Sequence, residues 1–216
     1  LWPTRCALCD APGAVLCARC AAQLDYLDFW RACPRCGAAF GFLQCDHCTP
    51  LANKGERIRP CVSALRYTAD TGVLIKTYKD KGEQRLSETL ATILANTLPP
   101  SWMTWANGVT YVSATNAARR RRGFDHMELL TRSLADQCGL PCIRTLNPPA
   151  TRDQRILGKT ERKQNMQGRF TACEPLSGRR LLLIDDVFTT GATMDQAGIA
   201  LELAGARVRC ATVARV

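Results

Sequence analysis

Two adjacent acids close the most hydrophobic short segment of the chain. Residues 181 to 194 have the sequence LLLIDDVFTTGATM, in which four apolar residues precede Asp185 and Asp186 and three threonines surround Gly191. Side-by-side carboxylates at the end of a buried strand repel each other unless something uses them. Carboxylates accept hydrogen bonds from sugar hydroxyls and can approach a phosphate-bound Mg²⁺. Asp185 and Asp186 are therefore the candidate catalytic residues.

The segment after the acid pair has the composition of an anion-binding loop. Gly191 allows a tight turn that brings backbone N–H groups close to an anion, and the threonine hydroxyls add donors. We expect Thr193 to cap the helix that follows. Acids and anion donors at this spacing indicate a ribose 5-phosphate site. The predicted phosphate-binding residues of this loop are Thr189, Thr190, Gly191, Ala192 and Thr193.

Other nucleotide motifs are missing from the chain. Neither the G-x-x-x-x-G-K-[ST] pattern of a P-loop nor the G-x-G-x-x-G turn of a dinucleotide-binding fold occurs in the sequence. The remaining alternative is an ordinary strand, turn and helix with two incidental surface acids.

Eight of the thirteen cysteines form four C-x-x-C pairs near the N-terminus. Such pairs suit tetrahedral thiolate sites for zinc, whereas one redox centre needs a single C-x-x-C. We expect two structural Zn²⁺ ions in two tandem ribbons, each ion bound by four neighbouring cysteines, with an interleaved pairing as the alternative. The predicted metal ligands are Cys6, Cys9, Cys17, Cys20, Cys33, Cys36, Cys45 and Cys48.

The net charge of +10 is unevenly distributed. Residues 116–170 hold twelve Lys/Arg against five Asp/Glu, whereas residues 1–60 hold seven against five. Zinc-bound thiolates would make the N-terminal module mildly acidic, so it is a poor candidate for the main nucleic-acid surface. The run Arg119, Arg120, Arg121 and Arg122 has three open interpretations: a solvated patch, a nucleic-acid contact or part of a pyrophosphate site.

The pattern after residue 60 alternates strands with helices. We predict strands at 61–68, 108–114, 140–146, 179–187 and 207–216, and helices over 72–98 (broken near Gly82), 124–139 and 193–206. This alternation predicts an α/β fold with a mostly parallel sheet flanked by helices. We predict a zinc-ribbon module at residues 1–52 and the α/β domain at residues 60–216, with residues 49–60 as a linker.

The segment 181–194 resembles the signature of the type I phosphoribosyltransferases, in which a hydrophobic strand, two acids and a T-T-G-[AS]-T loop bind phosphoribosyl pyrophosphate (PRPP). Further motifs narrow the resemblance to the ComF/GntX family over almost all of the chain. They are RRRRGFDHMELL at 119–130, DQRILGKTERKQNMQGRF at 153–170 and the double cysteine module. That family usually carries R-G-F-N-Q, where this chain has Asp125 and His126 in place of the amides, so no ligand contact is carried over to those two positions. We expect His126 to be a structural helix residue rather than a general base.

The resemblance implies roles for residues elsewhere in the chain. In type I enzymes the loop after the first core strand binds pyrophosphate, which corresponds here to Ser113, Ala114, Thr115 and Asn116. A flexible loop closes over the reaction, which corresponds to residues 147–169. The family pattern Q-x-x-L-x-x-x-x-R-x-x-N is matched by Gln154, Leu157, Arg162 and Asn165, and Arg162 joins the candidate basic residues. PRPP would bind together with Mg²⁺.

Two functions follow from these observations. The first is a Mg²⁺-dependent phosphoribosyltransferase-like protein that acts on PRPP or a nucleotide. The second is a non-catalytic nucleic-acid-binding accessory, because the ComF resemblance implies an association with DNA uptake and with single-stranded DNA. A zinc-ribbon interaction protein with an inactive domain is a third alternative. No segment approaches the roughly 18 apolar residues of a membrane span, so we expect a cytoplasmic protein without membrane insertion.

Overall fold

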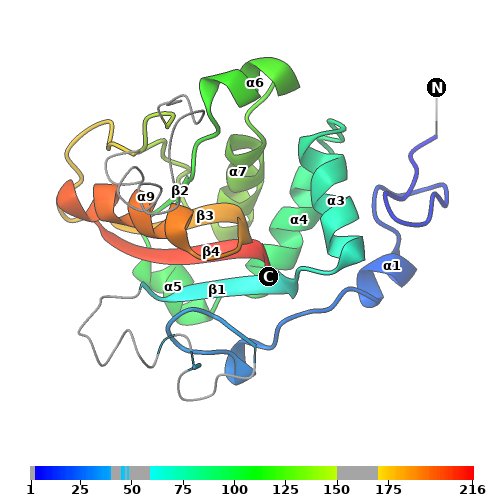
Figure 1. The fold of residues 1–216 in the computed structure, drawn as a ribbon, viewed down its shortest axis with the longest axis horizontal. Helices are drawn as coiled ribbons and strands as arrows, with labels where there is room; N and C mark the ends of the chain where they lie inside the picture. Colours follow the sequence, from blue (N-terminus) through cyan, green and yellow to red (C-terminus); the bar gives the residue numbers. More distant parts are fainter. Residues whose placement is uncertain (1–2, 40–44, 47, 49–58, 150–169) are drawn as a thin grey trace, which may run out of the picture.

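The core of the protein is a sheet of four parallel strands. The computed structural model describes residues 3–39, 45–46, 48, 59–149 and 170–216. The strands are β1 (Cys61–Arg66), β2 (Gly108–Tyr111), β3 (Arg180–Phe188) and β4 (Arg207–Arg215), in the spatial order β1-β4-β3-β2 (Figure 1). The carboxyl ends of all four strands therefore meet at one edge, where parallel sheets bind ligands.

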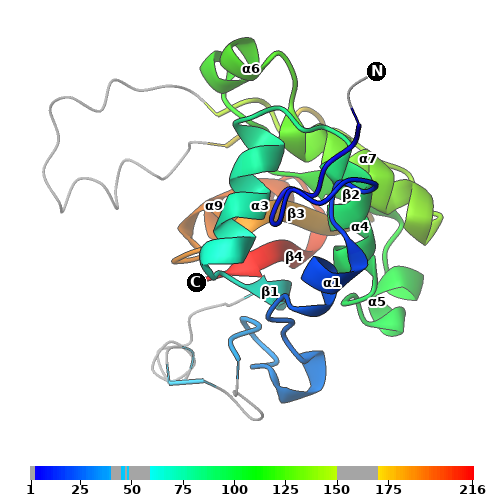
Figure 2. The same cartoon turned by 90° about the vertical axis from the view of Figure 1, so that its right-hand side faces the viewer.

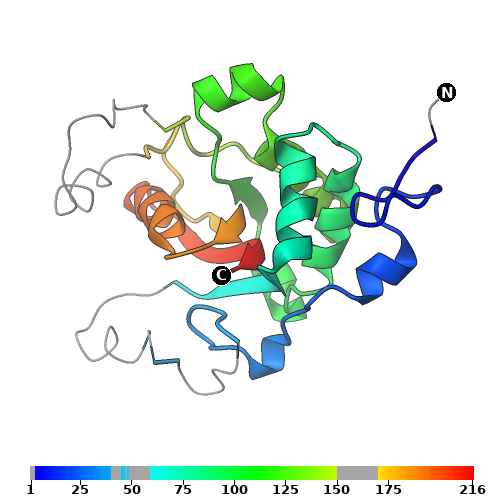
Figure 3. The ribbon, with the colours of Figure 1, turned by 45° about the vertical axis from the view of Figure 1, so that its right-hand side comes forward.

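Helices cover both faces of this sheet. The long ones are α3 (Ala69–Lys79), α4 (Leu86–Ala95), α7 (His126–Cys138) and α9 (Ala192–Leu203). The short ones are α1 (Ala18–Ala22), η1 (Phe29–Arg31), α5 (Pro100–Trp105) and α6 (Asn116–Arg122). Helices α3, α4 and α7 pack into one hydrophobic cluster, whereas α9 packs into a second cluster on the opposite face (Figure 3).

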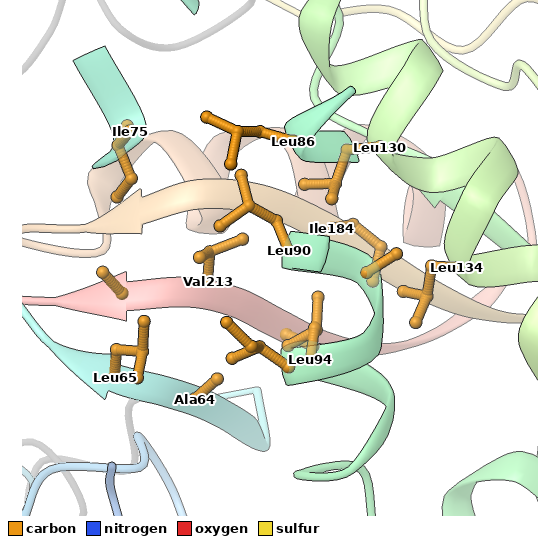
Figure 4. Packing of buried hydrophobic residues seen from close by; sticks show 14 of the residues in the cluster. Ala64, Leu65, Ile75, Leu86, Leu90, Leu94, Leu130, Leu134, Ile184 and Val213 are labelled. Carbon is orange, nitrogen blue, oxygen red and sulfur yellow. The ribbon is translucent and has the colours of Figure 1, made fainter. Parts of the chain in front are cut away.

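The larger cluster is built from leucines at helical spacing. Leu86, Leu90 and Leu94 lie on one side of α4 and are fully buried, as are Leu130 and Leu134 of α7. They contact Ile184 of β3 and Val213 of β4 across the sheet surface (Figure 4). Full burial of one such side chain contributes about 1.5–3 kcal/mol, so this layer holds α4 and α7 firmly against the strands.

Most of the predicted elements are confirmed. The predicted break near Gly82 is present, because α3 ends at Lys79, Gly82 has a φ of +76° and α4 begins at Leu86. The predicted helix at 124–139 is also present, and Gly139 caps it with a φ of +65°. The parallel sheet places four of the five predicted strands side by side in the same layer.

The strand predicted at 140–146 is wrong. Within the described residues this segment forms only isolated bridges, from Cys142 to Val109 and from Leu146 to Ala172. Two backbone hydrogen bonds tie it to β2: the Val109 N–H donates to Pro141 O (2.9 Å) and the Ile143 N–H donates to Val109 O (2.8 Å). Pro141 lacks an N–H donor, which limits the length of any ladder here.

The two N-terminal cysteine blocks lie against two different parts of the α/β domain. The first block surrounds Cys6–Cys20 and the second surrounds Cys33–Cys48. Leu16 and Leu24 of the first block join the cluster of α3, α4 and α7, whereas the cysteines of the second block form a small cluster of their own beside β1 (Figure 2). The predicted boundary between residues 52 and 60 falls largely outside the described residues.

Candidate functional site

The acid pair lies inside strand β3, near its carboxyl end. Asp185 pairs with Thr212 of β4, and the ladder continues past the acids to Phe188, which pairs with Arg215. The strand predicted at 179–187 is therefore confirmed with both acids inside it, and it ends one residue later, at Phe188. Neighbouring residues of a strand project to opposite faces, so the two carboxylates have different surroundings.

Asp186 faces the helices α3 and α7. Its Oδ2 atom accepts a hydrogen bond from Nζ of Lys79 at 2.7 Å, and Nε2 of His126 lies 3.4 Å from the same oxygen. Burial opposes ionisation of Asp186, but His126 and Lys79 outweigh it and hold the pKa of this carboxyl well below its usual range. Asp186 is therefore a charged group that the protein itself neutralises.

Asp185 has the opposite electrostatic character. Burial, together with the neighbouring Asp186 carboxylate, raises its pKa well above the usual range. Its Oδ1 atom accepts the N–H of Asp186 at 2.9 Å. Among the described residues, neither Oδ2 of Asp185 nor Oδ1 of Asp186 accepts a hydrogen bond.

The threonine loop leads directly into α9. Gly191 is the residue before the helix and has a φ of +78°, which side chains other than glycine rarely adopt. A Cβ atom at this position would lie 2.6 Å from Cζ of Phe188, so the loop also depends on close packing. The hydroxyl of Thr190 accepts the N–H of Ala192 at 3.4 Å.

The expected helix cap at Thr193 is wrong. Helix α9 begins at Ala192, so Thr193 is already inside its first turn, and Gly191 occupies the capping position. Glycine is a frequent alternative at that position, because it leaves the first N–H groups of the helix accessible. Thr189 and Thr190 are exposed at the mouth of the loop.

The second predicted phosphate loop leads into helix α6. Thr115 caps α6 by accepting the N–H of Ala118 at 3.2 Å, and Asn116 is the first helical residue. The hydroxyl of Ser113 donates to Leu146 O at 3.2 Å, and the N–H of Ala114 donates to Oδ2 of Asp125 at 3.4 Å. The internal bonds of Ser113 and Thr115 fix the shape of this loop.

The residues that replace the family amides have structural partners. Asp125 is buried and caps α7 by accepting the N–H groups of Met127 (3.1 Å) and Glu128 (3.4 Å). His126 begins α7 and is also buried, and its contact with Asp186 was not predicted from the sequence.

The four arginines of α6 have different surroundings. Arg122 is held by Asp80 (3.1 Å) and lies 3.2 Å from Nδ1 of His126, so it is linked through the imidazole to Asp186. Arg119 lies 3.8 Å from the Asp125 carboxylate. Arg120 and Arg121 are exposed. Arg162 and the other matches within the predicted loop (Gln154, Leu157 and Asn165) lie outside the described residues.

Lys79 and Asp80 are site residues that sequence reasoning missed. They lie at the end of α3, more than a hundred positions before the acid pair. A buried acid pair requires a nearby cation, but the sequence offers many lysines and arginines and no local pattern that selects Lys79. Only the packing of α3 beside β3 and α7 identifies it.

The eight paired cysteines form two groups that could each hold a metal ion. Cys6, Cys9, Cys17 and Cys20 form one group, and Cys33, Cys36, Cys45 and Cys48 form the other, with all sulfur atoms of a group within 4.8 Å of one another. This is the local arrangement of four neighbouring cysteines, not the interleaved one. Four thiolates in a tetrahedral set fit structural zinc.

Backbone N–H groups favour the thiolate form of one cysteine in each group, Cys6 and Cys33. The N–H of Cys17 donates to Sγ of Cys6 at 3.4 Å, and the N–H of Cys45 donates to Sγ of Cys33 at 3.4 Å. Burial opposes ionisation, but such donors lower the pKa of Cys6 to about 6 and that of Cys33 to about 7. Thiolates are the form of cysteine that binds zinc.

Comparison with known proteins points to one group of relatives. The chain is 28% identical over 207 residues to DNA utilization protein YhgH of Salmonella typhimurium, with 89% of this chain and 88% of the relative covered. It is 24% identical over 190 residues to competence protein F of Haemophilus influenzae, with 84% and 81% covered. Both proteins are homologues of this chain over most of its length. The resemblance to the ComF family, inferred above from motifs, is thereby confirmed.

The other comparisons add less about this chain. No protein-family model matches it. Among solved structures, the glutamine PRPP amidotransferase of B. subtilis has a TM-score of 0.41 at 18% identity, covering 60% of this chain and 26% of that one. Orotate phosphoribosyltransferase of Aeropyrum pernix has a TM-score of 0.37 at 15% identity, covering 68% and 77%. In the described part of the chain, no helix is long and apolar enough to cross a membrane.

Proposed function

We propose that this protein binds PRPP, or a nucleotide with the same ribose phosphate, at the carboxyl ends of its strands. The observation that carries the proposal is the pair of unused oxygens, Oδ2 of Asp185 and Oδ1 of Asp186. Both acids lie near the carboxyl end of β3, and carboxylate oxygens there suit the hydroxyls of a ribose. The loop 189–193 supplies the 5-phosphate site, because it ends at the N-terminus of the twelve-residue helix α9.

We assign the pyrophosphate of PRPP to the side of the acid pair that lies opposite the loop 189–193. Helix α6 and the loop 113–116 bring Arg119 and Arg122 near the buried end of α7, close to Asp125 and His126. Guanidinium groups bind phosphate oxygens in pairs, which gives both charge and direction. The internal partners of both arginines hold them in place before a ligand arrives.

The acids also fit the magnesium ion that accompanies PRPP. Burial and the neighbouring Asp186 carboxylate oppose ionisation of Asp185. A cation carried by the ligand would favour the ionised form and offset this effect. When bound, Mg²⁺ supplies positive charge for the departing pyrophosphate. For transfer of the phosphoribosyl group, Asp185 and Asp186 would orient the ribose, and Lys79 would fix the position of Asp186.

A titration with PRPP in the presence of Mg²⁺ tests the proposal. We expect the parent protein to bind PRPP and the Gly191→Ala variant to lose at least about tenfold in affinity, which corresponds to one charged hydrogen bond. Gly178→Ala is the matched control, because Gly178 has a similar φ of +76° but an open surrounding. Unchanged binding by Gly191→Ala would contradict the assignment of the loop to the 5-phosphate.

The second candidate function is that of a nucleic-acid-binding accessory in DNA utilization. It is favoured by the names of the relatives and by the exposure of Arg120 and Arg121 at the end of α6. Phosphate neutralisation by such side chains gives affinity without reading the sequence.

A salt series with single-stranded DNA tests this second candidate. Replacing Arg120 and Arg121 by Ala should reduce the slope of log affinity against log salt by about 1.4, because two phosphate contacts are lost. The pair Arg179 and Arg180, also exposed but located where β3 begins, provides a control of equal charge. If both double variants have the parent's slope, Arg120 and Arg121 belong to a solvated surface.

A further inference from the structure

A cavity separates the second cysteine block from the sheet, away from the acid pair. Its volume is about 230 Å³. Pro34 and Phe29 line it from the N-terminal segment, Val62 from the start of β1, Trp102 from α5 and Arg209 from the first part of β4. The acid pair lies near the end of β3, so the cavity and the proposed PRPP site occupy different ends of the sheet.

The walls of the cavity are held together by specific contacts. The N–H of Cys61 donates to Arg35 O at 3.0 Å, which joins the cysteine block to the edge strand β1. A Cβ atom at Gly37 would lie 2.6 Å from Cys61 O, so the two backbones touch there. Arg215 donates to Cys36 O at 2.6 Å from the far end of β4. The cavity is therefore a constructed space rather than a gap between loosely placed parts.

One cation, Arg209, lines the cavity. Its guanidinium lies 4.2 Å from the ring centre of Trp105 and 5.2 Å from that of Trp102. No carboxylate among the described residues forms an ion pair with it, and burial lowers its pKa. A guanidinium stacked on aromatic rings keeps the N–H groups at its edge free for hydrogen bonds. Arg209 can thus bind an anion, and the described part of the chain supplies none to it.

The other residues that line the cavity determine which chemical group can accompany the anion. Phe29, Trp102, Pro34 and Val62 offer apolar surfaces, and the hydroxyl-bearing residues Ser63 and Thr97 are also part of the lining, beside Cys33 and Cys61. The volume of about 230 Å³ is smaller than the roughly 300–1,000 Å³ of typical drug-sized sites, which limits the occupant to about one mononucleotide unit. Aromatic side chains stack on any nucleobase, since every base has a flat face.

We propose that this cavity binds one nucleotide, with its base against Phe29 and Trp102 and its phosphate on Arg209. The nucleotide is either free or one unit of a single strand, since the chemistry is the same in both. This site is independent of the proposed PRPP site, because the two share no residue.

Tryptophan fluorescence tests the nucleotide site, since Trp102 and Trp105 flank Arg209. Thymidine monophosphate and a six-residue oligothymidylate are titrated against the full chain, with thymidine and inorganic phosphate as the component probes. We expect quenching by both nucleotides and at least tenfold weaker binding of either component. An oligonucleotide that binds at least tenfold more tightly than the monophosphate identifies the strand as the source, and equal affinities identify the free nucleotide.

Variants separate this inference from the proposed function. Arg209→Met keeps the aliphatic stem and should weaken binding of the monophosphate at least tenfold, while PRPP affinity at the acid site stays that of the parent. Arg207→Met, exposed two positions earlier in β4, should change neither. Phe29→Ala provides a second test if Arg209→Met fails to fold. Parent-like nucleotide affinity in both Arg209→Met and Phe29→Ala, or competition between PRPP and the monophosphate for the same site, would overturn the inference.

Discussion

Removal of metal is expected to unfold both N-terminal cysteine blocks while the four-stranded sheet survives. The two groups of four sulfur atoms each fit one zinc ion, and residues 6–48 contain almost no continuous apolar run that could build a core in its place. Structural zinc contributes about 10–16 kcal/mol to the folding of comparable small modules. Elemental analysis of protein purified without chelator should find two zinc ions per chain, and a chelator should make the blocks sensitive to protease. A content well below two would count against structural zinc.

Cysteine variants distinguish zinc from a redox role. Cys20→Ser and Cys48→Ser should each lose one ion, because each removes one ligand from a different group. Cys173→Ser should keep both ions, since Cys173 is exposed and belongs to neither group. If reductant, rather than chelator, changed the protease pattern, the pairs would be disulfide-forming redox centres instead.

The parts of the fold that local sequence determines were predictable. The cysteine groups are formed by residues within fifteen positions of one another, so spacing favoured the local grouping over the interleaved alternative, and the structure shows the local one. The leucine spacing of α4 and the apolar run of β3 indicated helix and strand because each pattern has its own period. The segment 140–146 has a strand-like pattern as well, but Pro141 and its position beside the short strand β2 leave it with isolated bridges.

Only the part of the candidate site that consecutive residues form was predictable from the sequence. Asp185, Asp186 and the loop to Thr193 are consecutive, and their order indicates the chemistry. Their partners come from α3 and α7, and no local pattern connects Lys79 or His126 to β3. The sequence therefore suggested two equivalent acids, whereas the packing makes them different.

The two acids are expected to respond oppositely to replacement by asparagine. Asp186→Asn leaves Lys79 without its partner and should lower the free energy of unfolding by about 1–3 kcal/mol. This loss is smaller than that for a fully buried pair, because the side chains of Lys79 and Asp186 are 25% and 16% exposed. Asp185→Asn removes a carboxylate whose charge is unfavourable and should leave stability equal or higher at neutral pH. Chemical denaturation of both variants measures the difference.

The pH dependence has opposite signs for the two variants. The pKa of Asp186 is lowered in the folded state, so its stabilisation is full above about pH 4, the ordinary value, and is lost as the pH falls further. The difference in stability between the parent and Asp186→Asn should therefore become smaller in acid. The pKa of Asp185 is raised in the folded state, so Asp185 destabilises the fold increasingly as the pH rises above about 4. The stability of Asp185→Asn relative to the parent should therefore increase with pH. Identical profiles for the two variants would contradict the asymmetry.

Ligand affinity then decides whether this asymmetric pair serves PRPP. Both variants should bind PRPP at least about tenfold more weakly, since each loses one charged hydrogen bond to the ribose. The Asp185→Asn result is decisive, because this variant is expected to be as stable as the parent and its loss cannot be attributed to unfolding. A double-mutant cycle with Lys79→Met and Asp186→Asn measures the stability coupling of that pair separately. If Asp185→Asn bound PRPP as tightly as the parent, the acid pair would serve only the internal contacts of Asp186, and the sugar-phosphate assignment would fail.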